Sequence, residues 1–410
     1  MTTHEPVWDT ARRGAGSVFG LLERTAEVLP GGVRWQTLSY QNALGYDPGF
    51  WDGVAGIGAF LADYARVTGD ARARDLAAGA CAWSAAYAPA ELDVPEGYAA
   101  SLGWGWAGIG TAWLRLAAAT RDARHLSNAA AMGERVLAAG AGQRPSFLQG
   151  TAGRGTFLLR LWHATGAERP LAGAVRCAEA LRERLLPAAF GCPWPPPPGA
   201  VLPARPMGFA PGLAGIGYFF AVLYDATRDA RWGDATAQVA ALLSALAAPD
   251  RGGLNWPLAL DGTAGRVADP DLPRCQWCLG APGIGLFYLA AARALGDAAL
   301  LETARAAGEA TFAYGDARGN PSQCHGLAGN AELFVELWRA TGETVWLDRA
   351  GDFAARCLAY RKPGPEGDVW PADDLEYAAP NFSTGAAGVG HLFLRLLSLR
   401  GGTPLPSALG

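Results

Sequence analysis

One turn pattern recurs seven times along this 410-residue chain and constrains its fold more than any other feature. Each copy consists of a glycine, two further residues and a second glycine. The first glycines of the seven pairs are Gly53, Gly105, Gly150, Gly212, Gly280, Gly326 and Gly385. Self-similarity of this kind is the signature of a repeat architecture, whose length is not limited to that of an average domain. We therefore predict one domain that spans residues 1–410.

Each glycine pair is followed by apolar residues spaced as on one buried face of a helix. After Gly53 these residues are Ile57, Phe60, Leu61 and Tyr64. A glycine or arginine that is expected to end the helix follows sixteen residues after each first glycine. These residues are Gly69, Arg121, Gly166, Arg228, Gly296, Gly342 and Gly401. In five repeats an acidic residue comes next, which suits the start of another helix. Each repeat is thus predicted to be a pair of helices, and no strand pattern competes.

Seven helical hairpins can stack as an open solenoid or close into a ring. Closure removes the need for polar capping repeats, and neither the first nor the last repeat resembles a cap. We therefore predict an all-α fold, an (α/α) toroid with a double ring of seven inner and seven outer helices. Residues 9–29 would supply the first outer helix and pair with the final inner helix. A solenoid scaffold without chemistry is the alternative.

Charge, hydropathy and cysteine content limit the binding partners and the cellular location to be expected. The 38 acidic residues slightly outnumber the 34 basic ones, and a net charge of -4 argues against a nucleic-acid footprint. The N-terminus lacks a signal-peptide pattern, and no uninterrupted apolar stretch is long enough to predict a membrane span. Seven cysteines, an odd number, fit a reducing compartment better than a disulfide framework. We expect a soluble cytoplasmic protein, and the abundance of Ala, Gly and Arg suggests a bacterial source.

The residues just before the glycine pairs should gather at one end of the ring, where the N-termini of the inner helices converge. In two neighbouring repeats this position carries Cys278, Cys324 and His325 at equivalent depths. Two thiolates and an imidazole match a tetrahedral Zn²⁺ site whose fourth position is open, as in catalytic zinc sites. Taken singly, a buried cysteine for packing or a satisfied histidine is the ordinary alternative. Cys275 lies off the repeat register and ranks below these three ligands.

The segments WCLGAPG at 277–283 and CHGLAG at 324–329, together with the seven glycine pairs, resemble the lanthionine synthetase C-like cyclases over nearly the whole chain. This resemblance implies that Cys278, Cys324 and His325 are zinc ligands and that Arg274 is an active-site arginine. It implies an enzyme that adds cysteine thiols to dehydroalanine or dehydrobutyrine of a dehydrated ribosomal precursor peptide. The products are lanthionine or methyllanthionine thioether rings, and a dehydrating kinase or lyase is the partner enzyme to expect.

Three positions depart from the pattern of that family. Pro211, Ser146 and Leu279 stand where the family has a histidine acid or base, an aspartate and a tyrosine, respectively. The metal half of the site is therefore present, and the proton-transfer half is altered.

Zinc coordination would deprotonate a substrate thiol, and Arg274 could stabilise the enolate that forms when the thiolate adds. The group that protonates the enolate is left open. The candidates are Asp52, a water oriented by Gln149, His391 and bulk solvent.

Two other functions stay open alongside the cyclase. The chain could be a non-catalytic zinc-containing scaffold that binds the modified peptide and recruits partner enzymes. It could also add glutathione to dehydroamino acids. The proline-rich segment 192–206 is predicted to form a semi-rigid loop at the active end, with a plain surface connection as the alternative.

Overall fold

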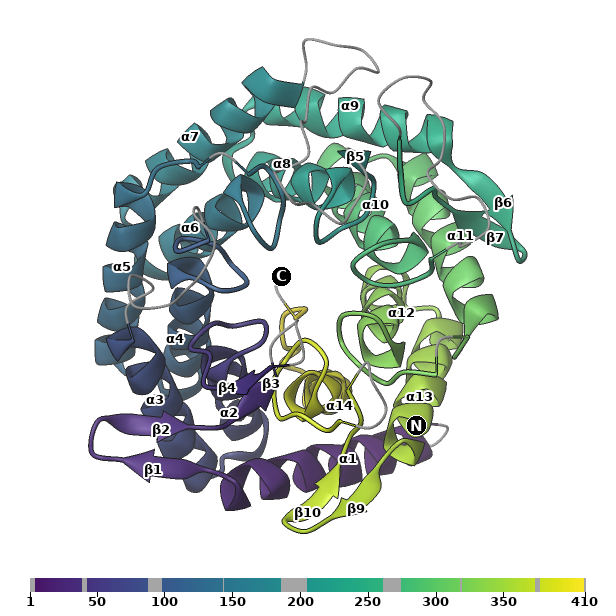
Figure 1. Cartoon of the computed structure of the whole chain (residues 1–410). Helices are drawn as coiled ribbons and strands as arrows, with labels where there is room; N and C mark the ends of the chain where they lie inside the picture. The colour runs from purple at the N-terminus through teal and green to yellow at the C-terminus, as the bar shows by residue number, and fades with distance from the viewer. Residues whose placement is uncertain are drawn as a thin grey trace. The chain divides into compact units, whose positions relative to one another are not determined.

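The computed structural model describes residues 4–38, 43–87, 98–142, 144–185, 205–260, 274–317, 319–372 and 377–408. Within these ranges the chain forms fourteen α-helices and ten short strands (Figure 1). The predicted proline-rich loop lies outside the described residues, except for positions 205 and 206.

Seven helices, here called the turn helices, each begin directly after the first glycine of a pair. They are α2 (Val54–Thr68), α4 (Trp106–Thr120), α6 (Thr151–Thr165), α8 (Leu213–Thr227), α10 (Ala281–Leu295), α12 (Leu327–Thr341) and α14 (Ala386–Arg400). The seven partner helices are α1 (Glu5–Arg24), α3 (Ala71–Ala86), α5 (Ala123–Ala138), α7 (Glu168–Leu185), α9 (Ala230–Leu246), α11 (Ala298–Tyr314) and α13 (Thr344–Ala359). The predicted alternation of the two kinds of helix is confirmed.

The chain divides into two compact units. In the first unit, which comprises residues 1–138, 316–335 and 343–410, α2 packs between α14 and α4. Helix α1 packs against α14, so the predicted pairing of the first partner helix with the last turn helix is confirmed (Figure 1). In the second unit, residues 139–315 and 336–342, α8 packs between α6 and α10, while α7, α9 and α11 cover them.

Close backbone approach explains the glycine pairs. The first N–H groups of α2 donate to carbonyl groups of its own turn, Val54 to Asp47 at 2.8 Å and Ala55 to Gly49 at 3.1 Å. A β-carbon on Gly53 would lie less than 3.0 Å from the Asp47 carbonyl oxygen. The carbonyl oxygen six residues earlier crowds the other six first glycines in the same way. Glycine is required because the turn folds back onto the helix start.

The predicted helix ends are confirmed at six of seven positions. Gly69, Arg121, Gly166, Arg228, Gly296 and Gly342 all adopt the left-handed conformation, with φ between 55° and 78°. Gly401 differs, with φ of -76°. The carboxylates of Asp70, Asp122, Asp229 and Asp297 cap the partner helices by accepting backbone N–H bonds. Glu343 departs from this, since its carboxylate accepts from the indole of Trp346 at 2.8 Å.

Short strands that the sequence pattern does not indicate connect some of the helices. Five antiparallel two-stranded sheets pair β1 (Glu27–Leu29) with β2 (Gly32–Arg34), β3 (Thr37–Leu38) with β4 (Leu44–Gly45), β5 (Arg205–Pro206) with β8 (Ala259–Leu260), β6 (Ala248–Asp250) with β7 (Gly253–Asn255), and β9 (Lys362–Gly364) with β10 (Gly367–Val369). Strands of two or three residues are too short to show the alternation by which a strand is recognised.

Buried tryptophans anchor three of these hairpins to the partner helices that precede them. The indoles of Trp35, Trp256 and Trp370 each donate at 2.8 Å to a carbonyl oxygen thirteen residues earlier. Each indole nitrogen is thereby satisfied inside the core, and the path of the chain toward the next glycine turn is fixed.

Candidate metal centre

Backbone hydrogen bonds join successive glycine turns at one equivalent position, two residues before the first glycine. In the second unit, Leu148 N–H donates to the Ala210 carbonyl at 3.1 Å, and Ala210 N–H donates to the Cys278 carbonyl at 3.2 Å. Cys278 therefore occupies this position in the turn that leads into α10. Its side chain is buried.

The first unit repeats the arrangement. Cys324 N–H donates to the Ser383 carbonyl at 2.9 Å, Ser383 N–H donates to the Trp51 carbonyl at 2.8 Å, and Trp51 N–H donates to the Gly103 carbonyl at 2.8 Å. Cys324 thus stands at the same depth of its turn as Cys278 does in the other unit. The equivalence that the sequence predicted is a consequence of this backbone pattern.

Cys278, Cys324 and His325 form a group in which each residue offers one ligand atom, and these atoms lie within 4.8 Å of one another. The Cys324 Sγ is 3.5 Å from the His325 Nε2. In tetrahedral zinc sites the metal lies roughly 2.3 Å from sulfur and about 2.0–2.1 Å from nitrogen, which places ligand atoms about 4 Å apart. The spacing and the chemistry of these donors therefore fit zinc, with room for a fourth ligand.

Arg274 lies six residues before Gly280, in the same turn as Cys278. Its carbonyl oxygen packs so closely on Gly280 that a side chain there would clash, and Gly280 has φ of 134°. The Arg274 side chain is partly buried, and its Nε has no hydrogen-bond partner among the described residues. The turn thus fixes the backbone from which this guanidinium extends.

Comparison with known proteins identifies the architecture. Residues 45–400 match the model of the lanthionine synthetase C-like protein family. The chain belongs to this family. The predicted resemblance is confirmed, and the match includes all seven glycine turns of the lanthionine synthetase C-like pattern.

Solved structures show the same fold. Nisin cyclase is similar with a TM-score of 0.64 and 17% identity, over 95% of this chain and 93% of that protein. Cellobiose 2-epimerase from Bacillus thermoamylovorans B4167 is similar with a TM-score of 0.55 and 10% identity, over 96% of this chain and 99% of that protein. The predicted all-α toroid is confirmed, with the turn helices as its inner helices and the partner helices as its outer helices.

A curated relative matches a shorter stretch. The glutathione S-transferase LANCL1 of Danio rerio is 35% identical over 89 residues, which are 22% of this chain and 22% of that protein. The match therefore spans less than a quarter of the relative's length.

The three departures from the lanthionine synthetase C-like pattern occupy turn positions. Pro211 is partly buried directly before Gly212, and Ser146 is buried in the turn before α6. Leu279 is buried beside Cys278, and its backbone exchanges both N–H and carbonyl bonds with Gln276, at 3.1 and 3.2 Å. Gln149 is partly buried next to Gly150. None of these four side chains carries an acidic proton at neutral pH.

The neighbouring Cys275 is kept out of the ligand group. Its Sγ lies 3.9 Å from the hydroxyl of Thr311. Burial raises the pKa of the Cys275 thiol to about 12, so it stays protonated. Its ranking below Cys278 as a ligand agrees with this placement.

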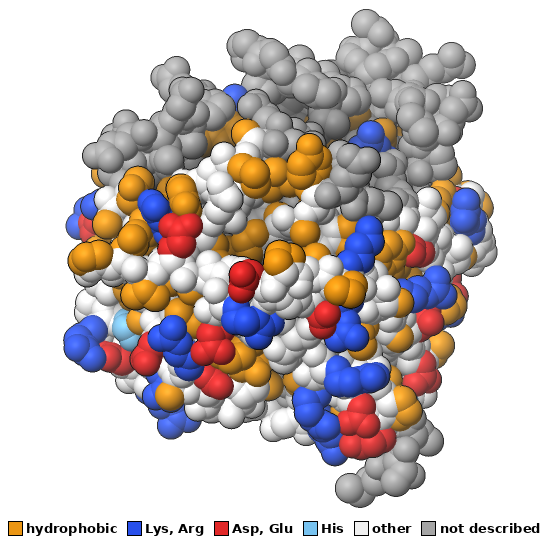
Figure 2. Space-filling model, turned by 60° about the horizontal axis from the view of Figure 1, so that its bottom comes forward, with side chains coloured by type: hydrophobic (Ala, Val, Ile, Leu, Met, Phe, Trp, Pro, Cys, Tyr) orange, Lys and Arg blue, Asp and Glu red, His pale blue; other side chains and the backbone are white. Residues whose placement is uncertain are grey.

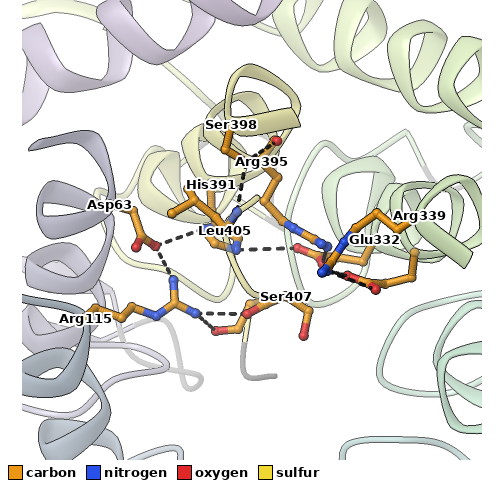
Figure 3. A network of polar contacts seen from close by, with 11 residues as sticks. Asp63, Arg115, Glu332, Arg339, His391, Arg395, Ser398, Leu405 and Ser407 are labelled. Atoms are coloured by element: carbon orange, nitrogen blue, oxygen red, sulfur yellow. Dashed lines mark hydrogen bonds and ion pairs between the residues drawn. The ribbon is translucent and has the colours of Figure 1, made fainter. Parts of the chain in front are cut away.

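A second group of titratable side chains, here called the charged cluster, lies on α2, α4, α12 and α14 (Figure 3). Its members are Asp63, Arg115, Glu332, His391 and Arg395, each no more than 6% exposed. Arg115 pairs with Asp63, and Arg395 pairs with Glu332. The two ring nitrogens of His391 lie 3.5 Å from Asp63 and 3.7 Å from Glu332. His391, one of the candidate acids, is thus surrounded by buried ion pairs.

The charged cluster also holds the end of the described chain. The Arg115 guanidinium donates to the carbonyl of Ser407 at 3.0 Å and to that of Ala408 at 2.6 Å (Figure 3). Leu405 N–H donates to the Ser398 hydroxyl at 2.9 Å, and the Leu405 side chain is fully buried. Leu405 and Ala408 are therefore packed in the interior of the first unit.

The charged cluster predicts that acid weakens the fold. Burial lowers the pKa of His391 below its ordinary value of 6.5, despite the nearby carboxylates of Asp63 and Glu332. His391 then binds a proton more readily in the unfolded chain than in the folded one. Its contribution to the free energy of unfolding is therefore complete above about pH 6.5 and decreases as the pH falls below that value. Urea unfolding at pH 7.5, 6.5 and 5.5 measures this decline. The decline should be smaller in His391→Gln, and an equal decline in both proteins would contradict the assignment to His391.

The surface shows no single-sign charged field on the face in view. Figure 2 shows Lys and Arg side chains interspersed with Asp and Glu among the described residues of this face. Among the described helices, none has the length and apolar character that crossing a membrane would need.

Proposed function

We propose that this chain is a zinc-dependent cyclase that forms thioether rings in a dehydrated precursor peptide. The observation that carries the proposal is the group of two sulfur atoms and one imidazole nitrogen within 4.8 Å, which leaves a fourth position for substrate. Membership of the lanthionine synthetase C-like family supports the same reaction. Because the family match runs from residue 45 to residue 400, we propose that both units belong to a single domain, residues 1–410.

The bound metal would keep a substrate cysteine as a thiolate at neutral pH. The sulfur then forms a bond to the β-carbon of dehydroalanine or dehydrobutyrine, and the π electrons of the alkene move toward the neighbouring carbonyl as an enolate. A proton added to the α-carbon completes the thioether. The chain's part is to hold Cys278, Cys324 and His325 in place, to stabilise the enolate and to admit a proton source.

We assign enolate stabilisation to Arg274. Its charge is permanent, and its backbone is fixed in the same turn as Cys278. A planar guanidinium presents several donors to an oxyanion, which the point charge of a lysine does not reproduce.

Replacement of Arg274 by lysine should slow cyclisation while zinc content and melting temperature stay unchanged. We expect a loss of about tenfold or more in rate, which corresponds to about 1.4 kcal/mol of transition-state stabilisation. Rates are measured from the disappearance of peptide thiols, and zinc by elemental analysis of the same samples. An unchanged rate with zinc bound would remove Arg274 from the mechanism.

We propose that water supplies the proton. Pro211 has no proton to donate. His391 lies six residues beyond Gly385, which places it about 9 Å along α14 from the glycine turn, and it belongs to the charged cluster. Gln149, partly buried beside its glycine, can orient a water molecule.

A second candidate function is the addition of glutathione to dehydroamino acids. The stretch of 89 residues that resembles the glutathione S-transferase LANCL1 favours it. The same metal group would serve, with the sulfur coming from a free tripeptide instead of the substrate chain.

One experiment separates these functions. Purified protein is incubated with a peptide that carries both dehydroalanine and cysteine, with and without glutathione. Cyclisation consumes the free thiol without a change in peptide mass, whereas glutathione addition increases the mass by one glutathione. Neither change in the presence of bound peptide and bound zinc would favour the zinc-containing scaffold. The setting we propose is the bacterial cytoplasm, with a dehydrating kinase or lyase as the partner that supplies the substrate.

A further inference from the structure

Asp52 differs from the other residues that directly precede a first glycine. The other residues are Trp104, Gln149, Pro211, Leu279, His325 and Thr384, and none of them carries a carboxylate. Its side chain is buried, with 4% of its surface exposed. Because a buried carboxylate is costly unless hydrogen bonds compensate it, its partners show what it does.

The two carboxylate oxygens of Asp52 reach two different turns. One oxygen accepts from the Trp104 indole Nε1–H at 2.8 Å, in the turn that leads into α4. The other accepts from the Ser383 hydroxyl, in the turn that leads into α14. Asp52 therefore ties together three successive turns of the first unit.

Ser383 continues this link to the metal ligands. Its carbonyl accepts the Cys324 N–H at 2.9 Å, and its own N–H donates to the Trp51 carbonyl at 2.8 Å. The turn that contains Asp52 thus holds Ser383 in two ways, by accepting a hydrogen bond from its hydroxyl and another from its backbone N–H. The backbone of Cys324, which is next to His325, rests on this fixed carbonyl.

We propose that Asp52 is a positioning residue for the metal centre: by fixing Ser383 it holds the Cys324 and His325 turn in the geometry that binds zinc. This inference rests on the proposed zinc centre. Among the acids that the sequence left open, Asp52 takes this different part because both of its oxygens already accept hydrogen bonds. Groups outside the ligand shell commonly orient the ligands and tune the affinity for the metal.

Asp47 provides a comparison within the same turn. Its Oδ1 accepts from the Gly49 N–H at 2.6 Å, so this bond stays inside its own turn. Burial, opposed by the hydrogen bond from the Gly49 N–H and aided by the negative charge of Asp52, raises the pKa of Asp47 to about 6. The two carboxylates are thus close in space, but it is the Asp52 carboxylate that accepts from the Ser383 hydroxyl.

The test measures zinc affinity in Asp52→Asn and in Ser383→Ala. Asparagine keeps the shape of the side chain but offers one acceptor oxygen in place of two. We expect zinc to dissociate about three- to tenfold more readily in both variants, less than the roughly 10–100-fold typical of groups bonded directly to a ligand. Competition with a chromophoric chelator gives the affinities, and the absorption spectrum of the cobalt-substituted proteins reports the ligand geometry.

Two matched variants serve as controls. Asp47→Asn alters the other carboxylate of the same turn. Ser101→Ala removes a serine hydroxyl that accepts from Trp104 N–H at 3.1 Å within its own turn. Both should bind zinc as the parent does, with the parental cobalt spectrum.

The outcomes keep the two proposals apart. Parental affinity and cobalt spectrum in both Asp52→Asn and Ser383→Ala would overturn the positioning role and leave the zinc centre intact. A parent protein that binds no zinc would instead refute the proposed function itself. If Asp52→Asn does not fold, Ser383→Ala decides alone, because it leaves the buried carboxylate and its bond to Trp104 in place.

Discussion

Replacing Cys324 with alanine is expected to remove the metal and abolish the formation of thioether rings, while the helices stay folded. The parent should carry about one zinc per chain, and the variant close to none after dialysis, because one of three protein ligands is lost. Since a change in a supporting residue alone costs about 10–100-fold in affinity or activity, loss of a ligand should reduce the cyclisation rate by more than about a hundredfold. Elemental analysis, circular dichroism and thiol counting measure the three quantities.

Cys275→Ala is the matched control for this experiment. Cys275 is also a buried cysteine, three residues before Cys278, but its sulfur lies near Thr311 and outside the ligand group. This variant should keep its zinc and its activity. Stoichiometric zinc in Cys324→Ala would refute the ligand assignment, and unfolding of that variant would point to a metal that serves the fold.

Replacing Arg395 with leucine should cost about 3–5 kcal/mol in the free energy of unfolding, because it leaves the Glu332 carboxylate without its partner in the core. Glu332 is fully buried and Arg395 is 1% exposed, so solvent cannot take over the role of the missing guanidinium. Urea titration followed by circular dichroism measures the loss. The double variant with Glu332→Leu should recover most of it, because no uncompensated charge then remains.

An exposed ion pair on the same helix as Glu332 gives the control. Arg339 and Glu336 lie 2.9 Å apart on α12, with side chains 36% and 25% exposed. Arg339→Leu should change the unfolding free energy by less than about 1 kcal/mol. Equal losses in Arg395→Leu and Arg339→Leu would show that burial does not set the cost.

The sequence predicts the turn helices because glycine spacing reflects a backbone requirement. A β-carbon at Gly53 or Gly56 would collide with a carbonyl oxygen of the preceding turn. Glycine is therefore required at these positions independently of which residues lie on the surface. The same register places Cys278 and Cys324 at equivalent depths. The candidate metal ligands could therefore be predicted from the sequence alone.

The short hairpins could not be found in this way, because two or three residues carry no periodicity. The tryptophans that anchor them, Trp35, Trp256 and Trp370, were a usable signal, since each follows a turn with glycine or acidic residues. This signal can be interpreted only when the hydrogen bond to the carbonyl group thirteen residues earlier is known.

The residues of the charged cluster also occupy regular positions in the sequence repeats. Asp63, Arg115 and Arg395 each stand ten residues after a first glycine, and Glu332 and His391 stand six residues after theirs. Positions six and ten share one helix face, apart from the apolar stripe that identified the helices. This face does not contribute to the apolar periodicity, and pairing between helices cannot be inferred from one helix alone.

The backbone bonds between successive turns separate the framework of the site from its chemistry. Cys324, Ser383 and Trp51 are linked through main-chain N–H and carbonyl groups, which every amino acid except proline supplies in full. A side chain at such a position can be exchanged by mutation without loss of the bond that holds its neighbour. The reactive side chains at these positions can therefore change while the backbone arrangement of the turns is kept.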